Sequence, residues 1–252
     1  MESEDVMGLK PEQVRFFKEN GYLILEDVVE TGVVNGWQRD LAAHLGKDAA
    51  SPETWADSPS QKSFDNFCFS PPESAPGYQA TLAAAARQLC GGAVRGGSPQ
   101  IIIRWPHEGR PWFVPHKGHI DILPRFLPFR FMVGLVTYAY EVETGGAPFV
   151  VWPGSHLTSW RYFQERPMDY GGRGDRTIDE VNDVLRERAS ADAVQFVAKP
   201  GTVLLWHSFL VHNGSVNARR TPRAAIFGRW GQPTEENEPR ETFGDIWERW
   251  AI

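Results

Sequence analysis

Residues 200–223, PGTVLLWHSFLVHNGSVNARRTPR, give the clearest indication of the fold. This stretch begins with a Pro-Gly turn, continues as an apolar run to His212, passes through a polar turn, and ends at Arg223, where a second apolar run begins. Short runs rich in β-branched and aromatic residues, bounded by turn-forming residues, are typical of strands. The stretch therefore predicts two strands that flank a polar turn, with a histidine before the turn and an arginine after it.

The same pattern of short β-branched and aromatic runs extends over the C-terminal part of the chain, whereas the N-terminal part alternates between helical and extended patterns. Many short strands predict a sandwich or barrel, so the expected fold is mainly β with flanking helices. The expected strands are 22–25, 100–105, 130–140, 147–152, 193–198, 202–211 and 223–230. The expected helices are 11–19, 33–45, 79–89, 177–189 and a short amphipathic one at 243–250, with a surface loop or lid at 47–76.

Composition narrows the class of protein. The chain has 252 residues, of which 41% are hydrophobic, and a net charge of −6 with scattered Lys and Arg. We expect one domain, 1–252, with a helical part at about 1–95 and the core at about 98–232. No basic cluster suggests nucleic acid and no apolar stretch suggests a membrane span. Two cysteines and an acidic N-terminus favour a cytoplasmic location; the oligomeric state is not predicted.

A metal-binding pattern lies at GHID, residues 118–121. Side chains two residues apart on an extended segment project to the same side, so His119 and Asp121 converge. Two histidines and one carboxylate form the facial triad of non-haem iron(II) oxygenases. His212 is the expected third ligand. His116 and His207 are the weaker candidates, because each lies an odd number of residues from its neighbouring ligand.

The combined pattern resembles the phytanoyl-CoA dioxygenase family of iron(II)/2-oxoglutarate oxygenases. The features that match span nearly the whole chain: the opening helix with its Gly-Tyr-Leu-Ile strand, His119-x-Asp121, Gly145-Gly146, Pro153-Gly-Ser-His156, Pro200-Gly-Thr, His212, Asn217 and Arg223. The resemblance implies a double-stranded β-helix (jelly-roll, cupin-like) core, with iron(II), dioxygen and 2-oxoglutarate as cofactor and co-substrates. It also implies that Arg223 binds the distal carboxylate of 2-oxoglutarate.

Further residues are expected near the site. Arg104 and Thr137 are predicted to contact 2-oxoglutarate, and the predicted substrate pocket contains Trp112, Trp152, Tyr138 and Asn217. Arg219 and Arg220 compete with Arg223 but lie in a polar turn. Arg229 shares the strand face of Arg223, so it is either a second anchor or a surface residue near the end of the sheet, and the surface position is the favoured expectation.

The predicted function is oxidation, most simply hydroxylation, of a small organic molecule in secondary-metabolite biosynthesis, with release of succinate and carbon dioxide. Two alternatives stay open. One is a cupin-like metalloenzyme that does not use 2-oxoglutarate, against which Arg223 argues. The other is a non-catalytic ligand-binding relative, against which the intact triad argues.

Overall fold

The computed structural model describes residues 8–55, 62–64, 80–91, 94–96, 99–107, 109, 111–121, 129–233 and 243–252. Cys68 and most of the loop expected at 47–76 lie outside these ranges. The helices are α1 (Pro11–Asn20), α2 (Thr31–Leu45), α3 (Ala80–Cys90), α4 (Ser155–Glu165) and α5 (Ile178–Arg188). The strands are β1 (Tyr22–Leu25), β2 (Lys62–Phe64), β3 (Arg95–Gly96), β4 (Gln100–Arg104), β5 (Phe129–Tyr138), β6 (Phe149–Val151), β7 (Val194–Phe196), β8 (Val203–His207), β9 (His212–Gly214) and β10 (Arg223–Pro233).

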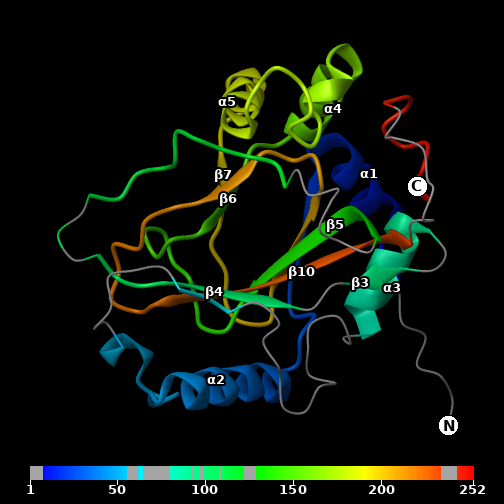
Figure 1. The fold of residues 1–252 in the computed structure, drawn as a ribbon. Helices are drawn as coiled ribbons and strands as arrows, with labels where there is room; N and C mark the ends of the chain where they lie inside the picture. The colour runs from blue at the N-terminus through cyan, green and yellow to red at the C-terminus, as the bar shows by residue number, and fades with distance from the viewer. Residues whose placement is uncertain are drawn as a thin grey trace, which may run out of the picture.

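Two antiparallel sheets form the core, as expected for a jelly roll (Figure 1). The larger sheet has the order β1-β8-β5-β10-β4-β2, with β3 also paired to β10. The smaller sheet has the order β7-β6-β9, and an isolated bridge between His119 and His212 extends it toward the GHID segment. The fold class predicted from the sequence, a double-stranded β-helix with flanking helices, is confirmed.

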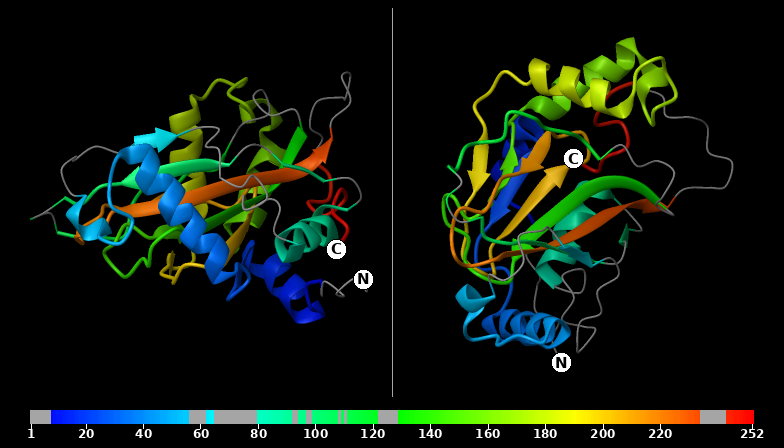
Figure 2. Two further views of the ribbon diagram at one scale, coloured as in Figure 1. Left: turned by 90° about the horizontal axis from the view of Figure 1, so that it is seen from below. Right: turned by 60° about the vertical axis from the view of Figure 1, so that its left-hand side comes forward.

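Strand alternation sorts the side chains into three hydrophobic clusters. On β10, Ile226 points to the cluster that packs beneath α1, α2 and α3, whereas Ala225 and Phe227 point to the cluster between the sheets. A third cluster lies between the smaller sheet and the pair α4 and α5. Figure 2 shows this layering, with α2 on one side of the sheets and α4 and α5 on the other. The interior between the sheets is therefore a separate compartment, and it carries the candidate site.

One helix was not expected and one expected helix is corrected. Gly154, at φ 75°, is the N-cap of α4, which the sequence analysis did not predict. Residues 246–249 form a turn in place of the helix expected at 243–250, with a backbone bond from Trp250 N–H to Trp247 O. The Asp245 side chain accepts a hydrogen bond from the Trp247 N–H at 2.9 Å, and such local bonds compete with helical ones.

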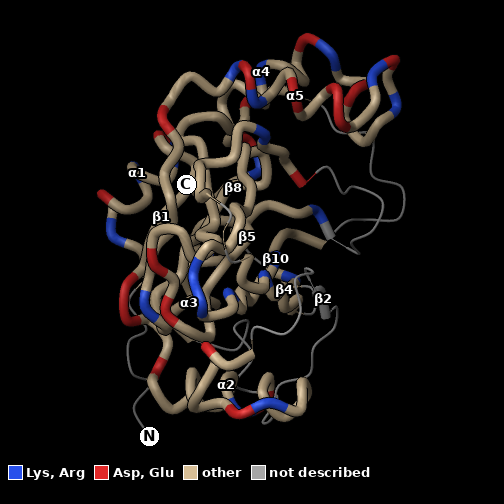
Figure 3. Tube along the Cα trace, turned by 90° about the vertical axis from the view of Figure 1, so that its left-hand side faces the viewer, with Lys and Arg blue, Asp and Glu red and all other residues tan. Residues whose placement is uncertain are grey.

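The surface carries both signs of charge. In Figure 3, Lys and Arg lie interspersed with Asp and Glu, notably around α4 and α5. Within the described ranges, no helix has the length and apolar character that a membrane span requires.

Candidate metal centre

His119, Asp121 and His212 come together in the interior, with one ligand atom of each within 4.8 Å of the others. The backbone creates this proximity, because His119 and His212 exchange N–H···O bonds of 2.9 and 2.8 Å. Asp121 Oδ1 lies 3.6 Å from His212 Nε2 and 3.9 Å from His119 Nε2. Ile120, between the two ligands, is buried in the opposite cluster beside α4 and α5. The alternation predicted for the GHID segment therefore holds.

The ring of His212 is held for coordination through one nitrogen. Its Nδ1 lies 2.9 Å from the carbonyl oxygen of Leu210, an acceptor, so Nδ1 carries the proton and donates. This leaves the lone pair of Nε2 facing Asp121. Second partners of this kind fix the tautomer and orientation of metal-binding histidines.

Neighbouring charges favour the ionised form of the Asp121 carboxylate. Burial alone would raise its pKa, but His212 and the Arg229 guanidinium outweigh burial and hold the pKa well below its usual range. Partial burial and the nearby His212 lower the pKa of His119 to about 4. The cluster therefore offers two imidazoles and one carboxylate as metal ligands. This donor set fits iron(II) with coordination positions left open.

Arg223 supplies a buried cation that has no counter-ion within the part of the chain that the structure describes. Its side chain begins β10 on the interior face and is 3% exposed. Neither Nε nor Nη1 has a hydrogen-bond partner among the residues that the structure describes. Burial lowers its pKa to about 10, with a counteracting contribution from Tyr138. A buried, unpaired guanidinium is costly unless a ligand pairs with it, so Arg223 is suited to bind the carboxylate of a ligand.

Arg104 stands directly beside Arg223. The two are cross-strand partners on β4 and β10, and burial lowers the pKa of Arg104. Its guanidinium lies across Gly214 of β9, where a Cβ would come within 3.0 Å of both Nε and Nη2. The glycine therefore gives Arg104 room to reach across the interior, where its buried Nε lacks a partner among the described groups.

Two expected site residues, Thr137 and Trp152, are placed elsewhere. Thr137 pairs with Ile226 and Val203, which face the helices, and its hydroxyl donates to Thr202 O at 2.8 Å. Trp152 is buried under α4 and α5, with the Arg186 guanidinium 4.5 Å from its ring. Both predictions are corrected for the same reason: each side chain points away from the compartment between the sheets.

Asn217 shapes the turn before Arg223. Its amide donates to the carbonyls of Arg104 and Thr221 at 3.1 and 2.9 Å, and its Oδ1 accepts from the Arg219 N–H at 2.9 Å. These bonds use its polar atoms within the protein. The expectation of a substrate contact is corrected to a role in holding the ends of β4 and β10 together.

Tyr138 lies in the interior, but its hydroxyl joins the two sheets. It donates to Phe196 O at 2.9 Å and accepts from the Phe149 N–H at 2.8 Å. Replacing Tyr138 with Phe leaves both backbone groups buried and unpaired, so we expect Tyr138→Phe to destabilise the protein by about 1–3 kcal/mol. Urea unfolding measures this loss. Tyr140→Phe, whose hydroxyl bonds to Ala49 O near the surface, is the milder control, and equal effects would contradict the assignment.

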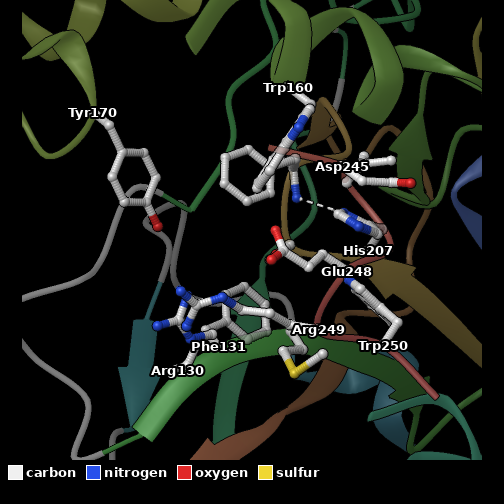
Figure 4. Close-up of a pocket in the computed structure, with 13 residues that line it drawn as sticks. Arg130, Phe131, Trp160, Tyr170, His207, Asp245, Glu248, Arg249 and Trp250 are labelled. Carbon is white, nitrogen blue, oxygen red and sulfur yellow. Dashed lines mark hydrogen bonds between the residues drawn. The ribbon is translucent and has the colours of Figure 1, made fainter. Parts of the chain in front are cut away.

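The alternative ligands lie apart from the triad. His116 is exposed and stacks on Phe113 at 5.8 Å. Figure 4 shows His207 in a different pocket, near Glu248 and Trp250, where its Nδ1 accepts from the Phe209 N–H at 3.1 Å.

Trp112, expected in the substrate pocket, is half-buried beside Gly145, and its contact with substrate stays a prediction.

The sequence interpretation missed two interior residues. Arg229 was expected at the surface, but it donates two hydrogen bonds to Asp121. Trp206 lies 5.5 Å from the His212 ring, over Gly134, where any Cβ would come within 2.1 Å of the indole. Arg229 lies an even number of residues after Arg223 on the same strand, which indicates that both side chains face the same side of the sheet. This spacing does not reveal that Arg229 lies close to Asp121.

Comparisons with known proteins agree with this geometry. A family model described as phytanoyl-CoA dioxygenase (PhyH) matches residues 17–225. Ectoine dioxygenase from Sphingopyxis alaskensis is 26% identical over 257 residues, which cover 92% of this chain and 81% of the relative.

Solved structures share the fold. The carbocyclase SnoK from nogalamycin biosynthesis, which is α-ketoglutarate-dependent, superposes with a TM-score of 0.61 at 17% identity, over 96% of this chain and 95% of that one. The iron-bound ectoine enzyme EctD from S. alaskensis gives 0.60 at 23% identity, over 98% and 84%. Since the family model covers most of the chain, the protein is a non-haem iron, 2-oxoglutarate-dependent oxygenase and belongs to the phytanoyl-CoA dioxygenase family.

Proposed function

We propose that this oxygenase hydroxylates a small organic molecule, in secondary-metabolite biosynthesis, with His119, Asp121 and His212 as iron ligands and Arg223 as the anchor of 2-oxoglutarate. The observation that carries the proposal is the buried Arg223 guanidinium, which lacks a protein partner among the described residues and shares the interior with the triad. A metalloenzyme that does not use 2-oxoglutarate has no need for this uncompensated charge.

Each residue has a defined task in this proposal. Bound iron(II) couples the reduction of dioxygen and the oxidative decarboxylation of 2-oxoglutarate to the oxidation of the substrate. The Nε2 atoms of both histidines and Oδ1 of Asp121 would hold the iron. Arg223 pairs with the distal carboxylate, and its planar guanidinium orients that group through two parallel hydrogen bonds.

The wall around the site favours a compact substrate. The rings of Phe149 and Trp206 lie 5.2 and 5.5 Å from the ring of His212, and Phe227 packs against both. These aromatic rings cover His212, whose side chain is 5% exposed, and give the site an apolar wall suited to a substrate carbon. The relatives named for ectoine and for nogalamycin biosynthesis also support a small molecule as substrate.

A substrate screen tests this proposal. Iron-loaded protein is incubated with 2-oxoglutarate and a panel of small metabolites, and both succinate release and product mass are measured. We expect one class of compound to stimulate succinate release and to gain one oxygen atom, with neither signal in His212→Ala. A product that lost two hydrogens and gained no oxygen would contradict hydroxylation. Turnover without 2-oxoglutarate would contradict the proposed reaction altogether.

A further inference from the structure

Arg229 binds one oxygen of the Asp121 carboxylate and leaves the other free. Its Nε and Nη2 lie 3.0 and 2.8 Å from Oδ2. Oδ1 is the oxygen that faces His212 and His119, at 3.6 and 3.9 Å from their Nε2 atoms. The two carboxylate oxygens are therefore already divided, one toward the arginine and one toward the metal-binding nitrogens.

Rigid neighbours hold Arg229 in this position. It lies on β10 opposite Gly134 of β5, and Trp206 covers that glycine. The guanidinium carbon is 5.8 Å from the centre of the Phe131 ring, and the Arg229 side chain is 21% exposed. Strand pairing and aromatic packing thus restrict the side chain, and its two hydrogen bonds to a single oxygen restrict Asp121 in turn.

We propose that Arg229 is a positioning residue that keeps Asp121 bound to iron through Oδ1 alone. A carboxylate with two free oxygens binds a metal through either one or both. If Oδ2 also entered the coordination sphere, it would occupy a position that the keto acid or dioxygen requires. By holding Oδ2, Arg229 preserves those open positions. The inference rests on the proposed roles of the triad.

The positive charge of Arg229 also affects the binding of iron, and this effect is unfavourable. A cation beside the carboxylate reduces the attraction between Asp121 and a divalent metal. Removing Arg229 should therefore leave iron affinity unchanged or increase it, while the binding of the keto acid becomes weaker. A residue that merely supported the fold around Asp121 would affect both in the same direction, downward.

The test uses two keto acids on the anaerobic iron(II) protein, each titrated through the visible charge-transfer band of the chelate. One is 2-oxoglutarate, and the other is 2-oxobutyrate, which lacks the distal carboxylate. We expect Arg229→Met to weaken both by about 10-fold or more, within the range for residues that orient metal ligands. Arg223→Met, the matched control, should weaken 2-oxoglutarate alone. Arg229→Lys keeps a charge and one donor, so it should give an intermediate effect on both.

Three results would overturn the inference. One is wild-type affinity of Arg229→Met for both keto acids. Another is a loss of iron affinity together with a lower melting temperature of the metal-free variant. If Arg229→Met does not fold, equal wild-type affinities in Arg229→Lys would be the third. A wild-type protein that binds iron but gives no band with 2-oxoglutarate would instead contradict the proposed function itself.

Discussion

Replacing Asp121 with alanine should reduce iron(II) affinity by more than about 100-fold and remove detectable turnover. Loss of a hydrogen-bond partner of a metal ligand typically costs about 10–100-fold in metal affinity or activity. Asp121 is itself a proposed ligand and supplies the single negative charge among the three, so its loss should cost more. Its loss also leaves Arg229 without the carboxylate that it binds. Iron content after anaerobic loading and desalting, together with succinate release, measures the effect.

Asp183→Ala is the matched control for this variant. The Asp183 carboxylate is half exposed and pairs with Lys117 at the surface, at 3.4 Å. This control should keep wild-type iron content and activity, because an exposed ion pair contributes little to stability. Retention of iron by Asp121→Ala at wild-type affinity would exclude Asp121 from the metal site.

Replacing Arg223 with methionine should raise the KM for 2-oxoglutarate by about 30-fold or more while iron binding persists. Removal of one partner from a buried, hydrogen-bonded charge pair costs about 2–5 kcal/mol, and about 1.4 kcal/mol corresponds to a factor of ten. The same variant should leave the melting temperature of the ligand-free protein unchanged or higher, because an unpaired buried cation is replaced by an apolar chain.

Arg220→Met provides the comparison for Arg223→Met. Arg220 is exposed in the turn three residues earlier, so its loss should change neither the KM for 2-oxoglutarate nor the thermal stability. If Arg223→Met altered mainly the iron content, Arg223 would belong to the metal site and the assigned role would be wrong.

Local chain geometry explains what was predictable from the sequence. His119 and Asp121 lie two residues apart on an extended segment, so their shared direction follows from strand alternation alone. Arg223 is the first residue of a strand whose following residues are mostly apolar. A strand of this composition is expected to be buried, and the structure buries Arg223. These inferences depend only on residues close together in the sequence.

The predictions that the structure corrected depended on how segments far apart in the sequence pair with one another. Thr137 and Tyr138 are adjacent, and only the register of β5 against β8 and β10 determines which of them faces the interior. The helix α4 was hidden because polar residues, Ser155 and His156, occupy its buried side. Arg229 and Asp121 are 108 residues apart, and nothing in the sequence of either segment reveals their ion pair.

The most direct test of the central claim is anaerobic titration of the iron(II)-loaded protein with 2-oxoglutarate, followed by visible absorption. We expect a saturable charge-transfer band from the chelated keto acid, which is lost in His212→Ala and shifted to much higher 2-oxoglutarate concentrations in Arg223→Met. If the wild-type protein binds iron but develops no band at saturating 2-oxoglutarate, the proposed binding of 2-oxoglutarate at this metal centre is wrong.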